Sequence, residues 1–232
     1  MMVSLARIGA TMIALAGGVL FLGGRSGVSG SDRPLTLPAP TLDSPLAAGG
    51  GTDTVVFAGG CFWGIQAVFE HVKGVTSAVS GYSGGHVRSP SYEEVSTGTT
   101  GHAESVQVVF DPSRVSFGKL LQIFFSVAHD PTEKDRQGPD VGTQYRSAVF
   151  YRTAEQRRIT EAYIAQLTQA KTFTRAIVTE VAPLTGFYPA EAYHQHYAML
   201  HPDSPYIATY DLPKVAALKA RYPDLYREPV AN

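Results

Sequence analysis

The stretch Gly-Gly-Cys-Phe-Trp-Gly at residues 59–64 constrains this chain most, because it holds the only cysteine, Cys61, next to an aromatic pair that includes the only tryptophan. A hydrophobic run over residues 54–58 precedes it, and apolar residues then recur at helical spacing up to residue 72. We therefore expect Cys61 to lie where a strand ends and a helix begins. Free N–H groups and the helix dipole favour an anion at that position, which predicts a stabilised, nucleophilic thiolate.

A structural role for Cys61 is the alternative, since a single cysteine is most often a small buried hydrophobic residue. The neighbouring residues favour function. Two glycines allow a substrate or another backbone to approach closely. Phe62 and Trp63 would expose much apolar surface at a helix start unless they line a pocket.

Composition excludes several classes of function. The chain of 232 residues has a formal net charge of −1 and 17% charged residues, which gives no electrostatic footprint for nucleic acid. One cysteine excludes an intrachain disulfide and a zinc site built from several cysteines. None of the seven histidines forms an HExxH pair, so we expect no metal.

The N-terminus has the order of a targeting segment. Arg7 supplies a positive charge, and residues 8–24 are uncharged and mostly apolar. Residues 1–25 are therefore predicted to be a signal peptide or an N-terminal membrane anchor. This predicts export to the periplasm, and, if the segment is not cleaved, anchoring of the protein in the inner membrane. Residues 26–53, rich in Gly, Ser, Pro, Thr and Asp, are predicted to be a flexible linker before a folded domain over residues 54–232.

Alternating periodicities within that domain predict an α/β or α+β fold, a small mixed sheet covered by helices. Strands are expected over residues 54–58, 75–80, 104–110, 146–152 and 177–181, and helices over 61–72, 92–95, 117–127, 153–171 and 215–222. Ser116 is a predicted helix cap, and Thr153 with Gln156 a capping box. Residues 129–145 are predicted to form a long polar loop, which inside a compact domain is usually functional or disordered.

Several motifs, in this order, resemble those of the methionine sulfoxide reductase A family. They are Gly-Cys-Phe-Trp-Gly at 60–64, Gly-Tyr-Ser-Gly-Gly at 81–85, Tyr92, Gly-His-Ala-Glu at 101–104, His-Asp-Pro at 129–131 and Asp-Val-Gly-Thr-Gln-Tyr-Arg-Ser at 140–147. The resemblance runs from about residue 55 to about residue 198. It implies an α/β roll built on a two-layer sandwich. It also implies a peptide-methionine (S)-S-oxide reductase, which repairs oxidised methionine, free or in proteins, at the expense of thiols.

The resemblance assigns the central chemistry to four residues. Cys61 matches the nucleophile, Phe62 and Trp63 match the walls of a pocket for the sulfoxide methyl group, and Glu104 matches the acid that protonates the sulfoxide oxygen. The chemistry is consistent with these types, because a thiolate is a suitable nucleophile for sulfur and the oxygen leaves only when protonated. Burial would raise the pKa of a carboxyl enough for this role. An exposed carboxylate at a strand end is the alternative for Glu104.

The resemblance also selects residues with supporting roles. Tyr92 and Tyr145 match tyrosines that hydrogen-bond the sulfoxide oxygen, and Asp140 matches a carboxylate near the cysteine. His194 and Tyr197 look similar to a less central His-x-x-Tyr element that contributes to substrate binding. The tyrosines have the alternative of being ordinary half-buried side chains, and Asp140 that of a turn residue.

This chain departs from the many relatives that carry a second, resolving cysteine near the C-terminus. It therefore resembles a one-cysteine form, with a helical C-terminal extension from about residue 199. The sulfenic acid formed on Cys61 would have to be reduced by an external thiol, and no bound cofactor is implied. Candidate donors are a thioredoxin-like protein, glutaredoxin or glutathione, with dithiothreitol in vitro. An exported protein would need a dedicated periplasmic dithiol donor.

Two other functions compete with this one. Another cysteine-based enzyme, a peroxidase or a hydrolase with His129 or His194 as base, would leave the aromatic pair and Glu104 unexplained. A secreted module that binds methionine-containing peptides would make Cys61 structural. The expected partners are oxidised proteins or peptides and a thiol donor, and the expected state is a monomer.

Overall fold

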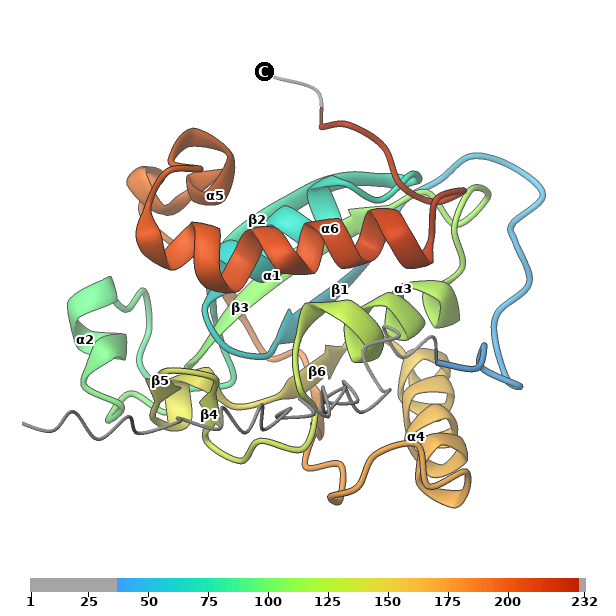
Figure 1. Cartoon of the computed structure of the whole chain (residues 1–232). Coiled ribbons are helices and arrows are strands. Elements are labelled where there is room, and N and C mark those ends of the chain that lie inside the picture. Colours follow the sequence, from blue (N-terminus) through green and yellow to red (C-terminus); the bar gives the residue numbers. More distant parts are fainter. Residues whose placement is uncertain (1–36, 230–232) are drawn as a thin grey trace, which may run out of the picture. The chain divides into compact units, whose positions relative to one another are not determined.

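A mixed six-stranded sheet forms the centre of the molecule, in the order β7-β6-β1-β3-β2-β8. The computed structural model describes residues 37–229 (Figure 1), so the predicted signal peptide or anchor over residues 1–25 lies outside the described residues. The strands are β1 Asp53–Ala58, β2 Val75–Ser83, β3 Ala103–Phe110, β6 Ala148–Tyr151, β7 Glu180–Pro183 and β8 Phe187–Pro189. Strands β6 and β7 run parallel, and the other neighbouring pairs run antiparallel.

Five of the described helices lie close to predicted positions, but the short helix over residues 197–200 was not predicted. The predicted helix over residues 117–127 is α-helical to Ile123 and continues as a π-helix over Phe124–Ala128. The helices are α1 Phe62–Glu70, α2 Tyr92–Ser96, α3 Phe117–Ile123, α4 Ala154–Gln169, α5 Tyr197–Leu200 and α6 Leu212–Arg221. The Ser116 side chain caps α3 as predicted, accepting a hydrogen bond from the Lys119 N–H. Only half of the predicted capping box forms at α4. The Thr153 hydroxyl accepts from the Gln156 N–H, but the Gln156 side chain accepts from the Arg152 N–H instead of the Thr153 N–H.

The main core lies between one face of the sheet and the helices. Phe57 of β1 stacks on Phe69 of α1 and on Phe124, with ring centroids 5.0 and 4.6 Å apart. Val106 and Val108 of β3 are fully buried in the same cluster, as their alternation predicts. Figure 1 shows α6 running across α1, so the C-terminal part of the chain covers the helix that follows Cys61.

A smaller cluster covers the opposite face of the sheet. It contains Val56, Ala58, Ala103, Ala148 and Phe150. Ala182 of β7, Leu184 and Phe187 of β8 pack against this cluster. The predicted class, a two-layer α/β fold with a small mixed sheet, is therefore confirmed.

Residues 37–43 correct the prediction of a flexible linker over residues 26–53. Leu37 is only 2% exposed, and its carbonyl accepts a hydrogen bond from Gln122 at 2.7 Å. The Asp43 carboxylate accepts from the Ser116 hydroxyl at 2.5 Å and from the Gly118 N–H at 2.7 Å. The folded domain therefore begins well before residue 54. Composition misled here because a single buried leucine and backbone carbonyls anchor the segment.

The predicted loop over residues 129–145 contains short elements. Strands β4 Arg136–Gln137 and β5 Asp140–Val141 pair antiparallel, and a 3₁₀ turn follows over Thr143–Tyr145. The Gln137 side chain bonds both the N–H and the carbonyl of Asp130, at 2.9 and 3.1 Å. Within residues 37–229, no helix is long and apolar enough to span a bilayer.

The anchoring of the N-terminal segment can be tested with two leucines. We expect Leu37→Ala to lower the free energy of unfolding by about 2–4 kcal/mol, because Leu37 is fully enclosed by the core. Leu46, which is 55% exposed, is the matched control, and Leu46→Ala should change stability by less than about 0.5 kcal/mol. Urea unfolding curves measure both. If both substitutions had equally small effects on stability, residues 37–43 would be a flexible linker and not part of the folded domain.

Candidate active site

Cys61 lies between β1 and α1 as predicted, at the N-cap of the helix. Gly60 before it has a positive φ of 96°, which favours glycine. A Cβ at Gly60 would meet the Gln137 side chain at 2.5 Å. The segment over residues 129–145 therefore packs directly against the glycine that precedes Cys61, and it leaves the cysteine 8% exposed.

The ionisation of Cys61 differs from the expectation. Burial raises the pKa of the Cys61 thiol well above its usual value, and the nearby Glu104 and Asp211 raise it further. A hydrogen bond from the Trp63 N–H and the Lys214 ammonium act in the opposite direction but do not outweigh burial. The prediction of a stabilised thiolate at rest is wrong, because the cost of removing a charge from water exceeds the effect of the helix terminus.

Glu104, at the start of β3, is buried beside the first turn of α1. Its carboxylate accepts a hydrogen bond from the Phe62 N–H at 3.0 Å, and only 3% of the residue is exposed. Burial raises the pKa of Glu104 to about 8, against which the Phe62 hydrogen bond acts, while Asp140 and Asp211 add to the increase. At neutral pH this carboxyl is mostly protonated and can donate a proton. The alternative of an exposed strand-end carboxylate is excluded.

Aromatic rings surround Phe62 and Trp63. Trp63 stacks on Tyr197 with centroids 3.9 Å apart and planes at 12°. The His194 ring lies 5.0 Å from the Phe62 ring and 5.8 Å from that of Trp63. The structure therefore brings the predicted His-x-x-Tyr element against the aromatic pair. Phe62 itself is 1% exposed and belongs largely to the core.

Tyr92, Tyr145 and Asp140 also gather around Glu104. The pKa of each tyrosine is raised, by burial first and then by the charge of Glu104. Asp140 is one of the acidic groups that raise the pKa of Glu104, so it lies close to the same site. Its carboxylate accepts a hydrogen bond from the Tyr206 hydroxyl at 2.5 Å.

Sequence reasoning missed four residues of this site. Tyr206 lies with its ring edge against Trp63, 6.1 Å between centroids, and binds Asp140. Asp211 and Lys214 follow in the same C-terminal segment. Glu191 accepts hydrogen bonds from the Tyr92 N–H and from the Tyr82 hydroxyl, both at 2.9 Å. The local sequence pattern of this proline- and tyrosine-rich segment does not indicate these contacts, which are made to residues far away in the chain.

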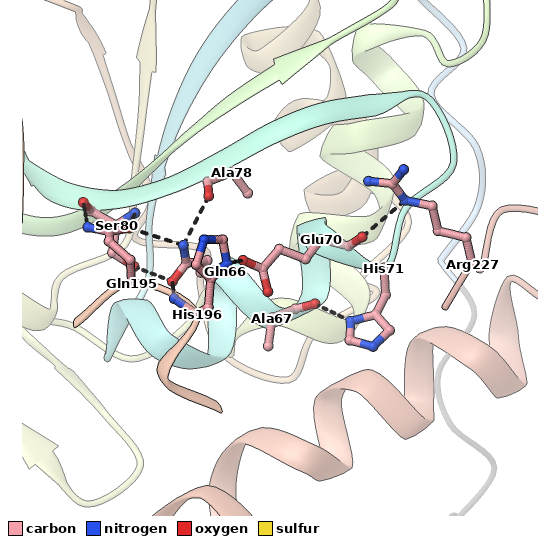
Figure 2. A network of polar contacts seen from close by, with 9 residues as sticks. All are labelled: Gln66, Ala67, Glu70, His71, Ala78, Ser80, Gln195, His196 and Arg227. Carbon is pink, nitrogen blue, oxygen red and sulfur yellow. Dashed lines mark hydrogen bonds and ion pairs between the residues drawn. The ribbon is translucent and has the colours of Figure 1, made fainter. Parts of the chain in front are cut away.

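A polar network holds the segment that carries His194 (Figure 2). The Gln195 amide donates to the Ser80 carbonyl and accepts from the Ser80 N–H, at 2.9 and 3.0 Å. Gln66 of α1 donates to Gln195 and accepts from the His196 N–H. His196 also contacts the Glu70 carboxylate at 2.5 Å. The network fixes Gln195 and His196 against both α1 and β2, next to His194 in the chain.

A cavity of 460 Å³ borders the same network. Its lining includes Glu70, His196, Met199, Arg227 and the segment 75–79, and none of the predicted site residues. The cysteine therefore lies in a covered site next to aromatic rings and not in this cavity.

His129 does not act as a base for Cys61. Its two ring nitrogens bond the Phe124 carbonyl at 3.1 Å and the Ser147 hydroxyl at 2.7 Å. Burial lowers the pKa of His129 to about 4, so the ring is neutral. His194 is also buried, and burial lowers its pKa. No group of three or more potential metal ligands occurs in the part of the chain that the structure describes.

A buried thiol, a largely protonated carboxyl and several aromatic rings thus lie together, and this arrangement is typical of a cysteine-dependent enzyme that also uses a general acid. The peptide methionine sulfoxide reductase family model matches residues 53–224, and the chain belongs to this family. The match extends beyond the resemblance that ended near residue 198.

Individual relatives agree. Peptide methionine sulfoxide reductase MsrA 2 of Mesorhizobium japonicum is 56% identical over 77% of this chain and 91% of its own length. MsrA of Thermus thermophilus is 49% identical over 75% and 98%. Among solved structures, methionine sulfoxide reductase A of Corynebacterium diphtheriae has a TM-score of 0.57 at 34% identity, over 74% of this chain and 90% of its own. The reduced form of Mxr1 from Saccharomyces cerevisiae has a TM-score of 0.59 at 28% identity, over 71% of this chain and 92% of its own. The predicted family and its thiol-dependent reduction of methionine sulfoxide are confirmed.

The raised pKa of Glu104 has a consequence for stability. A carboxyl whose folded pKa exceeds its unfolded pKa stabilises the protein at low pH, and this contribution is lost as pH rises through the folded value of about 8. We therefore expect the free energy of unfolding of Glu104→Gln, relative to that of the wild type, to be roughly 3–5 kcal/mol higher at pH 8 than at pH 4.5. Urea unfolding at both pH values measures it. The exposed Glu93→Gln is the control, and a parallel pH dependence of all three proteins would contradict the buried acid.

Proposed function

We propose that this enzyme reduces the S epimer of methionine sulfoxide, free or in proteins, with Cys61 as nucleophile and Glu104 as general acid. The observation that carries the proposal is the hydrogen bond between the Glu104 carboxyl and the Phe62 N–H, which fixes a largely protonated acid one residue away from the cysteine. The Cys61 sulfur attacks the sulfoxide sulfur while Glu104 gives its proton to the oxygen. The attack forms an S–S bond, the proton of the Cys61 thiol joins that from Glu104 on the oxygen, and the S–O bond breaks with release of water. A water molecule then attacks the Cys61 sulfur and returns a proton to Glu104; the S–S bond breaks, methionine leaves, and Cys61 becomes a sulfenic acid.

The remaining residues fit roles in substrate binding. Phe62 and Trp63 would hold the S-methyl group by dispersion and sulfur–aromatic contact. Tyr92 and Tyr145 would donate hydrogen bonds to the oxygen, since their raised pKa values keep both hydroxyls protonated. Asp140 would support the site through Tyr206.

His194 and Tyr197 would orient the Trp63 ring, because they pack directly against it. They therefore act on the substrate through Trp63 and contribute to binding more than to proton transfer.

An external thiol would complete the cycle, because the chain has no second cysteine. One thiol attacks the Cys61 sulfenic acid, an S–S bond forms, and the hydroxyl leaves with a proton as water. A second thiol then releases Cys61 as a thiol and leaves the donor as a disulfide. We propose a thioredoxin-like protein or a glutaredoxin or glutathione donor in the cell, and dithiothreitol in vitro.

Export is proposed from the apolar N-terminal run alone. The enzyme would act in the periplasm, held to the inner membrane if the N-terminus is not cleaved, as a monomer with a dedicated dithiol donor. Cell fractionation decides this, and a mature protein in the cytosol would contradict it.

The epimers of a methionine sulfoxide peptide test the reaction. With dithiothreitol, the protein should convert the S epimer and leave the R epimer, and Cys61→Ser should abolish conversion because it removes the nucleophile. Chromatographic quantification of methionine measures both. A peptide-binding module would instead show no turnover and unchanged binding after the substitution.

The absence of a resolving cysteine predicts a defined stoichiometry. Without a reductant, we expect about one methionine per enzyme and a sulfenic acid on Cys61 that dimedone traps, because no second thiol exists in the chain. Mass spectrometry of the labelled peptide measures it. Several turnovers without any thiol would show that the reaction does not leave Cys61 as a sulfenic acid.

A further inference from the structure

The surroundings of Cys61 are predominantly acidic. Glu104 of β3 and Asp211 both oppose ionisation of the thiol, and Lys214 of α6 is the described cation that favours it. Three tyrosines also face this group, Tyr92, Tyr145 and Tyr206, and Asp140 faces Glu104. The proposed chemistry explains Glu104, but it does not explain why a second carboxylate lies here.

Asp211 rests on the first turn of α1. A Cβ at Gly64 would lie 2.1 Å from the Asp211 Oδ1 atom and 2.7 Å from the Lys214 Nζ atom, so only glycine leaves room for the pair. Gly64 follows Cys61 by three residues, and positions three apart are neighbours on a helix surface. The carboxylate therefore rests on the helix turn that begins at Cys61, against the backbone of Gly64.

The carboxylate is completely buried yet only half paired. Asp211 is 0% exposed, its Oδ1 atom accepts from Lys214 at 3.0 Å, and its Oδ2 atom has no hydrogen-bond partner among the described residues. An unsatisfied buried oxygen is costly, and a buried ion pair is seldom more stable than an apolar pair of similar size. Stability alone therefore does not account for the arrangement.

We propose that Asp211 is a positioning residue whose buried charge keeps Cys61 protonated in the resting enzyme and so protects it from peroxide. Burial raises the pKa of Asp211, and the Lys214 ammonium, which donates to its Oδ1 atom at 3.0 Å, acts against this increase and favours the charged carboxylate. This deepens the proposed function and rests on Cys61 as its nucleophile. Hydrogen peroxide oxidises a thiolate to a sulfenic acid with release of hydroxide, and a second peroxide, with release of water, gives a sulfinic acid, which thiols do not reverse. An enzyme without a resolving cysteine cannot convert its sulfenic acid to an internal disulfide, so slow oxidation of the thiol by peroxide protects it.

Alkylation of the single cysteine tests the proposal without any sulfoxide. We expect Asp211→Asn to lower the pH midpoint of iodoacetamide labelling by on the order of one unit, because it removes a nearby negative charge and keeps the side-chain shape. At pH 7 the thiolate fraction, and with it the rate of oxidation by hydrogen peroxide, should rise about tenfold. Peptide mass spectrometry distinguishes the sulfinic acid from the sulfenic acid.

Two further variants separate charge from structure. Lys214→Arg keeps the charge beside Asp211 and should leave the midpoint unchanged. Asp203→Asn removes an exposed carboxylate of the same segment and should do the same. A purely structural role of Asp211 would change labelling at every pH without moving the midpoint. An unchanged midpoint in folded Asp211→Asn protein, verified by circular dichroism, would overturn the proposal even if reductase activity is present.

Discussion

The hydrogen bond between the Phe62 N–H and the Glu104 carboxylate joins the two halves of the site. It connects the first turn of α1, which carries Cys61, to the first residues of β3. The bond satisfies a backbone donor that a helix start leaves free, and it does so with a carboxyl that burial keeps protonated at neutral pH. Sheet register then fixes the separation of Cys61 and Glu104, because β1 and β3 are neighbours.

The C-terminal segment closes the site from the other side. Tyr206 contacts Trp63 and binds Asp140, while Asp211 rests on Gly64. This chain has no resolving cysteine in its C-terminal segment, and the segment instead helps to bury the region around Cys61. The last glycine of the Gly-Cys-Phe-Trp-Gly motif is explained by that cover, since any side chain there would displace Asp211.

The fold and the central residues could be predicted because they leave strong local signals. Alternation gave β3, capping gave the start of α3, and the resemblance gave Cys61 and Glu104. The ionisation of Cys61 could not be predicted, because it depends on burial by segments far away in the sequence. The anchored Leu37 and the role of Tyr206 were missed for the same reason.

Gln195 has a consequence for how β2 can pair with other chains. Its amide exchanges two hydrogen bonds with Ser80, as a residue of a neighbouring strand would, and Gln66 bonds the Ala78 carbonyl of the same edge. Strand β8 pairs with residues 81–83 of β2, and these two glutamines bond backbone groups of Ala78 and Ser80 in the part of β2 that β8 leaves uncovered. Open strand edges pair readily with other chains. The hydrogen bonds from Gln195 and Gln66 therefore make these positions of β2 less able to pair with an exposed strand of another protein.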